Sequence, residues 1–173
     1  MYDLEISQAS QITGVDKNLI AAIIMQESSW NKNAIYRDKD GGSSYGLMQI
    51  RLDTARDLLD EPSLTPSILS RPYTNILAGS HYLRQSFRRW RDIKDVIASY
   101  NAGKPRKNAL GEYTNSKGIT NVQKYVNRVM GYYKQYSSRK GKFEPINFLS
   151  NSQNILLTTS LVGLVGLVWF NKD

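Results

Sequence analysis

Apolar residues recur along this chain at intervals of three and four, the spacing that places side chains on one face of an α-helix. Three stretches carry the pattern: Ile20, Ile23, Ile24 and Glu27; then Ile93, Val96, Ile97 and Tyr100; then Tyr125, Val126, Val129, Met130 and Tyr133. Helices with such faces bury them against one another. The sequence therefore predicts a mainly α fold.

Local signals predict where helices begin and where loops lie. Asp16 is the predicted N-cap of the first of these helices, and Thr74 is the predicted N-cap of a further helix. The segments 37–44 and 104–118 contain several turn-forming residues and are expected to be loops. The first loop could carry a short hairpin or line a cleft.

The composition limits the chain to one core and narrows the classes of partner. With 173 residues, 40% of them hydrophobic, the sequence can build one ordinary domain and an appendage. Cysteine is absent, which excludes disulfide bonds and thiolate metal sites. The net charge of +8 favours an anionic partner, but the basic residues are spread out, and no phosphate-binding loop or zinc-finger spacing accompanies them. Nucleic acid is therefore not the expected partner.

An uncharged, mostly apolar stretch lies near the end of the chain, at residues 155–170. It lacks a polar face and ends in Trp169 and Phe170, which predicts a single C-terminal transmembrane helix that anchors the chain in a lipid bilayer. Its length as a helix would be about 24 Å, slightly less than a hydrocarbon core of ~30 Å. The alternative is a buried terminal helix. The expected organisation is a helical domain at residues 1–137, a basic and polar linker at 138–154, and the anchor.

Glu27 is an acid at the end of an otherwise apolar helix. If the helix ends near Ser28 or Ser29, burial against the core-facing wall and the partial negative charge of the helix C-terminus both raise the pKa of Glu27. A carboxyl that stays protonated near neutral pH can donate a proton to a leaving oxygen. From this helix alone, the alternative is a last-turn side chain that points to solvent.

Two further segments add groups suited to binding a ligand. Ser44–Ile50 places a glycine, where backbone can approach a ligand closely, before a methionine and a glutamine. Ala98–Gly103 ends an amphipathic helix with an aromatic residue, an amide and a glycine. Taken singly, each segment is more often an ordinary turn or helix end.

Taken together and in this order, the segments resemble the lytic transglycosylase family, the SLT or goose-type lysozyme-like proteins. The resemblance runs from about Ile20 to Tyr133. It rests on Glu27–Trp30, Asn33–Ala34, Gly46–Ile50, Thr54–Ala55, Asn75–Ile76, Gly79, Tyr82–Leu83, Ser99–Gly103 and Tyr125–Val126. The loop from Tyr36 to Tyr45 is longer than in many members, which leaves the preference for particular sugar units open.

The resemblance implies a mostly α, lysozyme-like fold with a cleft for the glycan strands of peptidoglycan. In this family one Glu protonates the glycosidic oxygen and then takes the proton from the C6 hydroxyl of muramic acid, which yields a 1,6-anhydromuramyl end without consuming water. No cofactor or metal ion is implied. By position the catalytic residue is Glu27, and the residues expected to bind substrate are Ser28, Ser44, Gly46, Met48, Gln49, Tyr100, Asn101 and Tyr125.

The other acids bear on this assignment, because ordinary glycosidases use two carboxylates. Asp38 and Asp40 lie in a Gly-Ser loop, where solvated turn acids are the usual case, and Asp53 is expected to cap the next helix. A mechanism in which the acetamido group of the substrate stabilises the cationic centre would need only Glu27, as the resemblance suggests. A hydrolytic muramidase is the alternative enzyme, and a membrane-anchored wall-binding or structural protein without activity is the alternative outside enzymes.

The expected location combines a membrane with the cell wall. Residues 1–5 include two acids and no apolar run, so no secretory signal peptide is expected there. More basic residues precede the apolar stretch than follow it, which by the positive-inside bias would leave the helical domain on the cytoplasmic side, away from peptidoglycan. The two expected locations are therefore the bacterial cell envelope and the internal membrane of a bacteriophage virion, which would deliver the protein to the wall during genome entry.

Overall fold

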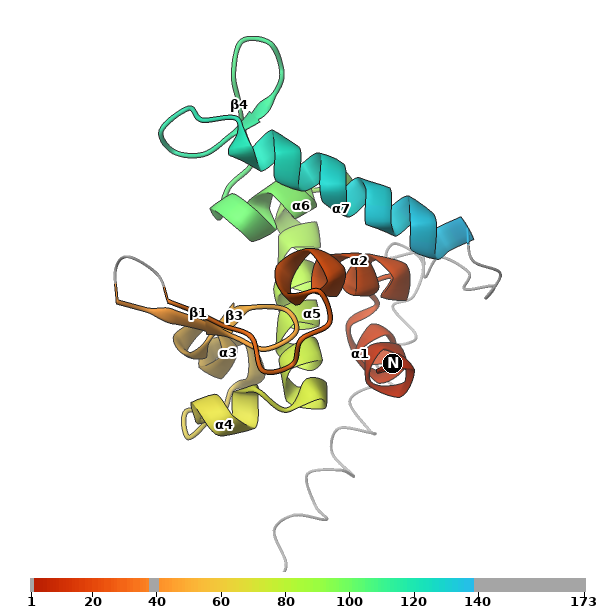
Figure 1. Cartoon of the computed structure of the whole chain (residues 1–173), viewed down its shortest axis with the longest axis vertical. Helices are drawn as coiled ribbons and strands as arrows, with labels where there is room; N and C mark the ends of the chain where they lie inside the picture. Colours follow the sequence, from red (N-terminus) through yellow and green to blue (C-terminus); the bar gives the residue numbers. More distant parts are fainter. Residues whose placement is uncertain (1, 38–40, 139–173) are drawn as a thin grey trace, which may run out of the picture. The chain divides into compact units, whose positions relative to one another are not determined.

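The computed structural model describes residues 2–37 and 41–138, and this part is mainly helical (Figure 1). The chain divides into two units, Met1–Phe143 and Glu144–Asp173, and the description concerns the first. The helices are α1 (Asp3–Thr13), α2 (Lys17–Ser28), α3 (Leu52–Leu59), α4 (Pro66–Leu69), α5 (Pro72–Arg89), α6 (Ile93–Ala102) and α7 (Asn121–Ser138). The strands are β1 (Ile35–Arg37), β2 (Ser43–Tyr45), β3 (Ile50–Arg51), β4 (Arg106–Lys107) and β5 (Tyr113–Thr114).

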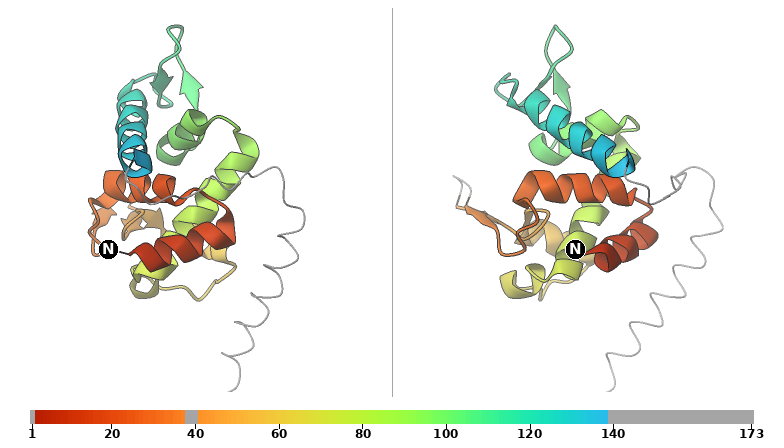
Figure 2. Two further views of the ribbon diagram at one scale, coloured as in Figure 1. Left: turned by 90° about the vertical axis from the view of Figure 1, so that its right-hand side faces the viewer. Right: turned by 45° about the vertical axis from the view of Figure 1, so that its right-hand side comes forward.

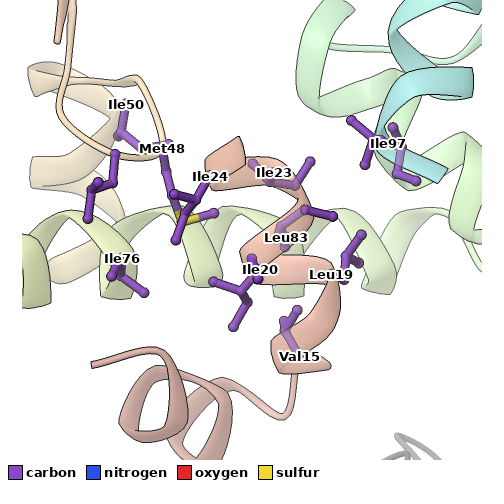
Figure 3. Close-up of a cluster of buried hydrophobic side chains, with 14 of the residues drawn as sticks. Val15, Leu19, Ile20, Ile23, Ile24, Met48, Ile50, Ile76, Leu83 and Ile97 are labelled. Atoms are coloured by element: carbon purple, nitrogen blue, oxygen red, sulfur yellow. The ribbon is translucent and has the colours of Figure 1, made fainter. Parts of the chain in front are cut away.

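Helix α2 is the apolar helix at the centre of the core. Asp16 caps its start by accepting a hydrogen bond from the Asn18 backbone N–H at 2.8 Å, as the sequence predicts. Every residue from Leu19 to Ile24 is buried, because α2 packs against both α1 and α7. Figure 2 shows α7 lying against α2. In Figure 3 the buried side chains of α2 gather with Met48, Ile76 and Leu83.

Helix α5 is long and packs against α1, α3 and α6, so it contributes to the core along much of its length. The prediction that Thr74 caps this helix is wrong, because α5 begins at Pro72 and its N-cap is Arg71. Proline is well suited to the first helical position, since its fixed φ is already helical and it has no N–H to leave unpaired. Thr74 therefore lies inside the first turn.

Within the described residues, two small antiparallel sheets interrupt the helices. The first has the strand order β1-β2-β3, with Tyr36 opposite Ser44 and Ser44 opposite Arg51. The second pairs β4 with β5 and follows α6. The expectation that the loop around residues 37–44 could carry a hairpin is thus confirmed, whereas the hairpin within residues 104–118 was not predicted.

The predicted transmembrane anchor at residues 155–170 lies outside the described residues, as does all of the predicted linker except Ser138. Among the helices of residues 2–37 and 41–138, none combines the length and the apolarity needed to span a bilayer.

Candidate active site

Glu27 lies in the last turn of α2, which ends at Ser28. The residue is partly buried, and one carboxylate oxygen accepts a hydrogen bond of 2.5 Å from the Tyr125 hydroxyl of α7. Burial raises the pKa of Glu27 from its ordinary value of 4.5 to about 6, although the Tyr125 hydrogen bond opposes this shift. Glu27 therefore keeps a proton in mildly acidic solution, where an ordinary glutamate is ionised.

Glu27 opens onto a groove of about 500 Å³. The residues that line the groove come from α2, the three-stranded sheet, the segment between β2 and β3, and helices α3, α5 and α6. They are Glu27, Tyr36, Ser44, Gln49, Ile50, Arg51, Thr54, Tyr82, Tyr100 and Asn101. Aromatic rings beside hydroxyl and amide groups suit a sugar, which presents both apolar faces and hydroxyls to a protein.

Hydrogen bonds from three helices hold the segment between β2 and β3 beside Glu27. The donors and acceptors are Asn75 of α5, Ser28 of α2 and Tyr100 of α6. Asn75 of α5 is fully buried, accepts from the Met48 N–H at 2.8 Å and donates to the Tyr45 carbonyl at 2.8 Å. Ser28 donates to the Leu47 carbonyl at 2.8 Å, which ties the end of α2 to the same segment. Gly46 has a φ of +73°, and a Cβ there would lie 2.5 Å from Nδ2 of Asn75. Only glycine fits this turn.

Two tyrosines extend the hydrogen bonding around the carboxyl. The Tyr100 hydroxyl donates to the Met48 carbonyl at 2.8 Å, and its ring meets the Tyr82 ring edge-on at a centroid distance of 5.2 Å. Burial, with the nearby Glu27 charge as a second cause, raises the pKa of Tyr100 and of Tyr125 well above the ordinary value of 10. Both hydroxyls therefore remain protonated and act as donors.

The structure divides the nine residues proposed from the sequence into two groups. Those that line the groove are Glu27, Ser44, Gln49, Tyr100 and Asn101. Those that do not line the groove but contact or position the residues around it are Ser28, Gly46, Met48 and Tyr125. Gln49, although it lines the groove, also donates to the Ala34 and Gly46 carbonyls at 3.1 and 2.8 Å.

Sequence reasoning missed several lining residues. Tyr36, Ile50, Arg51 and Thr54 come from the small sheet and the start of α3, and Tyr82 comes from α5. Strands of two or three residues are too short to show an alternating pattern, so nothing local marked Tyr36 and Arg51 for a role. Ile50 and Thr54 belong to the family resemblance, but the resemblance assigned them no contact with substrate. Tyr82 belongs to the family resemblance, but its helical spacing assigned it no contact with substrate.

A second carboxylate is absent from the lining residues of the described part of the chain. Asp53 is exposed, forms an ion pair with Arg51 at 3.6 Å and accepts from the Thr54 N–H at 2.8 Å. It does not cap α3 as predicted, because that helix begins at Leu52 and Asp53 lies in its first turn. Asp38 and Asp40 lie outside the described residues. Residues 2–37 and 41–138 also hold no cluster of histidine and acidic side chains that could bind a metal ion.

The helical fold, with a carboxyl of raised pKa at the end of a buried helix and facing a groove of tyrosines and polar groups, is that expected of a lysozyme-like protein. The comparisons make this specific. Residues 5–123 match the family model of the transglycosylase SLT domain, and the chain belongs to this family. The predictions of a lysozyme-like fold and of a peptidoglycan lytic transglycosylase domain are thereby confirmed.

Three relatives illustrate the similarity. The chain is 30% identical over 139 residues to X polypeptide of Escherichia coli, covering 80% of this chain and 78% of that protein. It is 37% identical over 111 residues to membrane-bound lytic murein transglycosylase C of Shigella sonnei, covering 57% of this chain and 30% of that one. The 70-kDa soluble lytic transglycosylase of Escherichia coli is similar with a TM-score of 0.63 and 26% identity, over 78% of this chain and 24% of that one. The chain thus spans about a quarter of that enzyme's length.

Proposed function

We propose that Glu27 is the single catalytic residue with which this chain cleaves the β-1,4 bond between N-acetylmuramic acid and N-acetylglucosamine in peptidoglycan. The observation that carries the proposal is the partly buried carboxyl with a pKa of about 6, the only acid among the groove-lining residues of the described part of the chain. A lone acid suits a reaction in which the substrate supplies its own nucleophile.

In the first step Glu27 gives its proton to the glycosidic oxygen as the bond from that oxygen to C1 of muramic acid breaks. The acetamido oxygen of the substrate stabilises the cationic C1. In the second step the ionised Glu27 takes the proton of the C6 hydroxyl while the bond from O6 to C1 forms. The product is a 1,6-anhydromuramyl end, Glu27 is protonated again, and no water is consumed.

The remaining site residues take supporting roles in this proposal. Tyr125 orients the Glu27 carboxyl, and Ser28 and Tyr100 hold the segment from Gly46 to Gln49 through its carbonyl groups. Ser44 and Asn101 line the groove and offer a hydroxyl and an amide to sugar hydroxyls.

The test is to digest purified sacculi with the full chain and with Glu27→Gln, and to weigh the released fragments. Anhydro products from the wild type and no fragments from Glu27→Gln would support the proposal. Products heavier by one water would identify a hydrolytic muramidase instead. Undiminished digestion by Glu27→Gln would overturn the role of Glu27, and no digestion by either protein would favour a wall-binding protein without activity.

The site of action under this proposal is the cell envelope, because the substrate is there, and residues 155–170 anchor the chain in a lipid bilayer. The uncharged composition of that stretch supports the anchor. Carbonate extraction of membranes should leave the full chain in the pellet and release a chain that ends at Ser138. Delivery by a bacteriophage virion with an internal membrane is one route to the wall, and detection of the protein in purified particles tests it.

A further inference from the structure

Three side chains of the small sheet lie in one row across its strands. Tyr36 of β1 is opposite Ser44 of β2, and Ser44 is opposite Arg51 of β3. Directly opposed residues of antiparallel strands project from the same face of the sheet. All three line the groove, so this face presents an aromatic ring, a hydroxyl and a guanidinium side by side. Figure 1 shows this sheet beside α3.

Arg51 is held in its place by the backbone around it. A Cβ at position 42 would lie 2.3 Å from the terminal nitrogen Nη2 of Arg51, so Gly42 makes room for the guanidinium to lie against the main chain. Arg51 also pairs with Asp53 through Nε at 3.6 Å, with side-chain exposures of 38% and 71%. An ion pair this long and this exposed is weak.

The groove therefore contains two charged residues with separate surroundings. Glu27 is partly buried and accepts a hydrogen bond from Tyr125, and Arg51 is a cation on the sheet. Burial and the Tyr125 hydrogen bond are the causes of the Glu27 pKa shift, and Arg51 is not among them. Arg51 lines the groove, and a guanidinium is suited to bind a carboxylate of a ligand there.

Muramic acid differs from its neighbour in the glycan strand by the lactyl group on its C3 oxygen. That group ends in a free carboxylate in bare strands, and in intact wall it carries a peptide with carboxylates of its own. We propose that Arg51 binds a carboxylate of this lactyl-linked group, with Tyr36 and Ser44 completing the subsite. The inference rests on the proposed function, since it concerns the same groove and the same glycan.

The test compares steady-state kinetics of the full chain on three substrates: peptide-bearing glycan strands, strands freed of peptide by an amidase, and peptide-bearing strands whose carboxyls have been converted to neutral amides. Arg51→Gln should raise KM on peptide-bearing strands about tenfold, the effect of losing one charge-assisted contact, and should leave kcat within about twofold. Arg51→Lys should recover part of the loss. On the neutral strands, wild type and Arg51→Gln should have the same KM.

Arg37→Gln is the matched control, because Arg37 is an exposed arginine of the same sheet that does not line the groove. It should leave KM unchanged. The effect on peptide-bearing strands comes from a carboxylate of the peptide, because the lactyl carboxyl is there part of an amide bond. A rise in KM on peptide-free strands would show that Arg51 also binds the free lactyl carboxylate. An unchanged KM for Arg51→Gln on both charged substrates, or an equal rise for Arg37→Gln, would overturn the inference.

The proposed function can fail separately. If Glu27→Gln digests the wall as the wild type does, the catalytic proposal fails, whatever the variants of Arg51 show. If Glu27→Gln is inactive, the wild type is active and Arg51→Gln changes only the melting temperature, then the subsite alone is wrong.

Discussion

At the scale of the residue, burial of Glu27 has a free-energy cost that depends on pH. The folded protein holds the proton to a pKa of about 6, against an ordinary value of 4.5. Below pH 4.5 the carboxyl is protonated in both states and the cost is absent. As pH rises towards 6 the unfolded chain ionises first, so the folded state loses stability, by about 2 kcal/mol in total.

Glu27→Gln should therefore stabilise the fold at neutral pH while it removes activity. Glutamine has nearly the shape of the protonated acid but cannot ionise, so the variant avoids the cost of about 2 kcal/mol at pH 7 and gains nothing at pH 4. Urea unfolding of both proteins between pH 4 and 8 measures this difference. If the difference in unfolding free energy between the two proteins were constant across this pH range, the carboxyl would not be held in its protonated form. The activity of Glu27→Gln is expected to be lower than that of the wild type by a factor of about 10² to 10⁴.

The Tyr125 hydroxyl also affects the pKa of Glu27. Its hydrogen bond lowers the pKa of Glu27, so Tyr125→Phe should raise that pKa further above its ordinary value. The first step needs protonated Glu27, and the activity of the wild type should fall as pH rises through about 6. In Tyr125→Phe this fall should move to higher pH, with a lower kcat because the carboxyl is less well oriented.

The pH profile of kcat/KM measures both effects, and Tyr133→Phe is the control. Tyr133 is also on α7 and also donates to a carboxylate, at 2.7 Å from Asp16, but it does not line the groove. Its loss should leave the pH profile in place. A shift to lower pH in Tyr125→Phe would contradict the assigned hydrogen bond.

At the scale of the element, Asn75 connects α5 to the segment between β2 and β3. It is fully buried and pairs with the Met48 N–H and with the Tyr45 and Leu69 carbonyls. Asn75→Ala would leave these buried groups unpaired and open a small cavity, at a cost of about 2 to 4 kcal/mol. Denaturant unfolding measures the loss, and kcat should fall as well because the segment beside Glu27 loosens.

Gln85→Ala on the same helix is the matched control, since Gln85 is exposed. It should change stability by less than about 0.5 kcal/mol. Equal stability of the two variants would show that the segment is held by its other contacts, those of Ser28, Gln49 and Tyr100.

Some elements of the fold could be predicted from the sequence, and others could not. The periodic apolar faces of α2, α6 and α7 and the cap at Asp16 were predictable, because their determinants lie within a few residues of one another. The row of Tyr36, Ser44 and Arg51 was not, because register between short strands depends on contacts distant in sequence. Of the groove residues named in advance, Glu27, Gln49, Tyr100 and Asn101 belong to the family resemblance, and Ser44 lies shortly before one of its segments. Ile50, Thr54 and Tyr82 belong to the resemblance too, but only the coordinates place them in the groove, as they do Tyr36 and Arg51.

At the scale of the whole molecule, an aromatic contact joins the two ends of the described domain. Tyr2 stacks on Trp30 at a centroid distance of 6.4 Å, and the Trp30 indole N–H donates to the Tyr136 hydroxyl at 3.2 Å. Within residues 2–37 and 41–138, the buried hydrophobic side chains lie from Ile6 to Val129. We propose on these grounds that a chain of residues 1–138 folds alone and cleaves glycan.

A matched pair of truncations tests this domain boundary. The chain ending at Ser138 should unfold with the same free energy as the full chain and digest sacculi at a similar rate. The chain ending at Gly131 loses Tyr132, Tyr133 and Tyr136, which pack against the core, and should be less stable by about 3 kcal/mol or more. Since Tyr136 contacts Trp30, three residues after Glu27 in the sequence, the shorter chain should also lose activity at temperatures where it is still folded. If both truncated chains matched the full chain, the last turns of α7 would have no part in holding the catalytic end of α2.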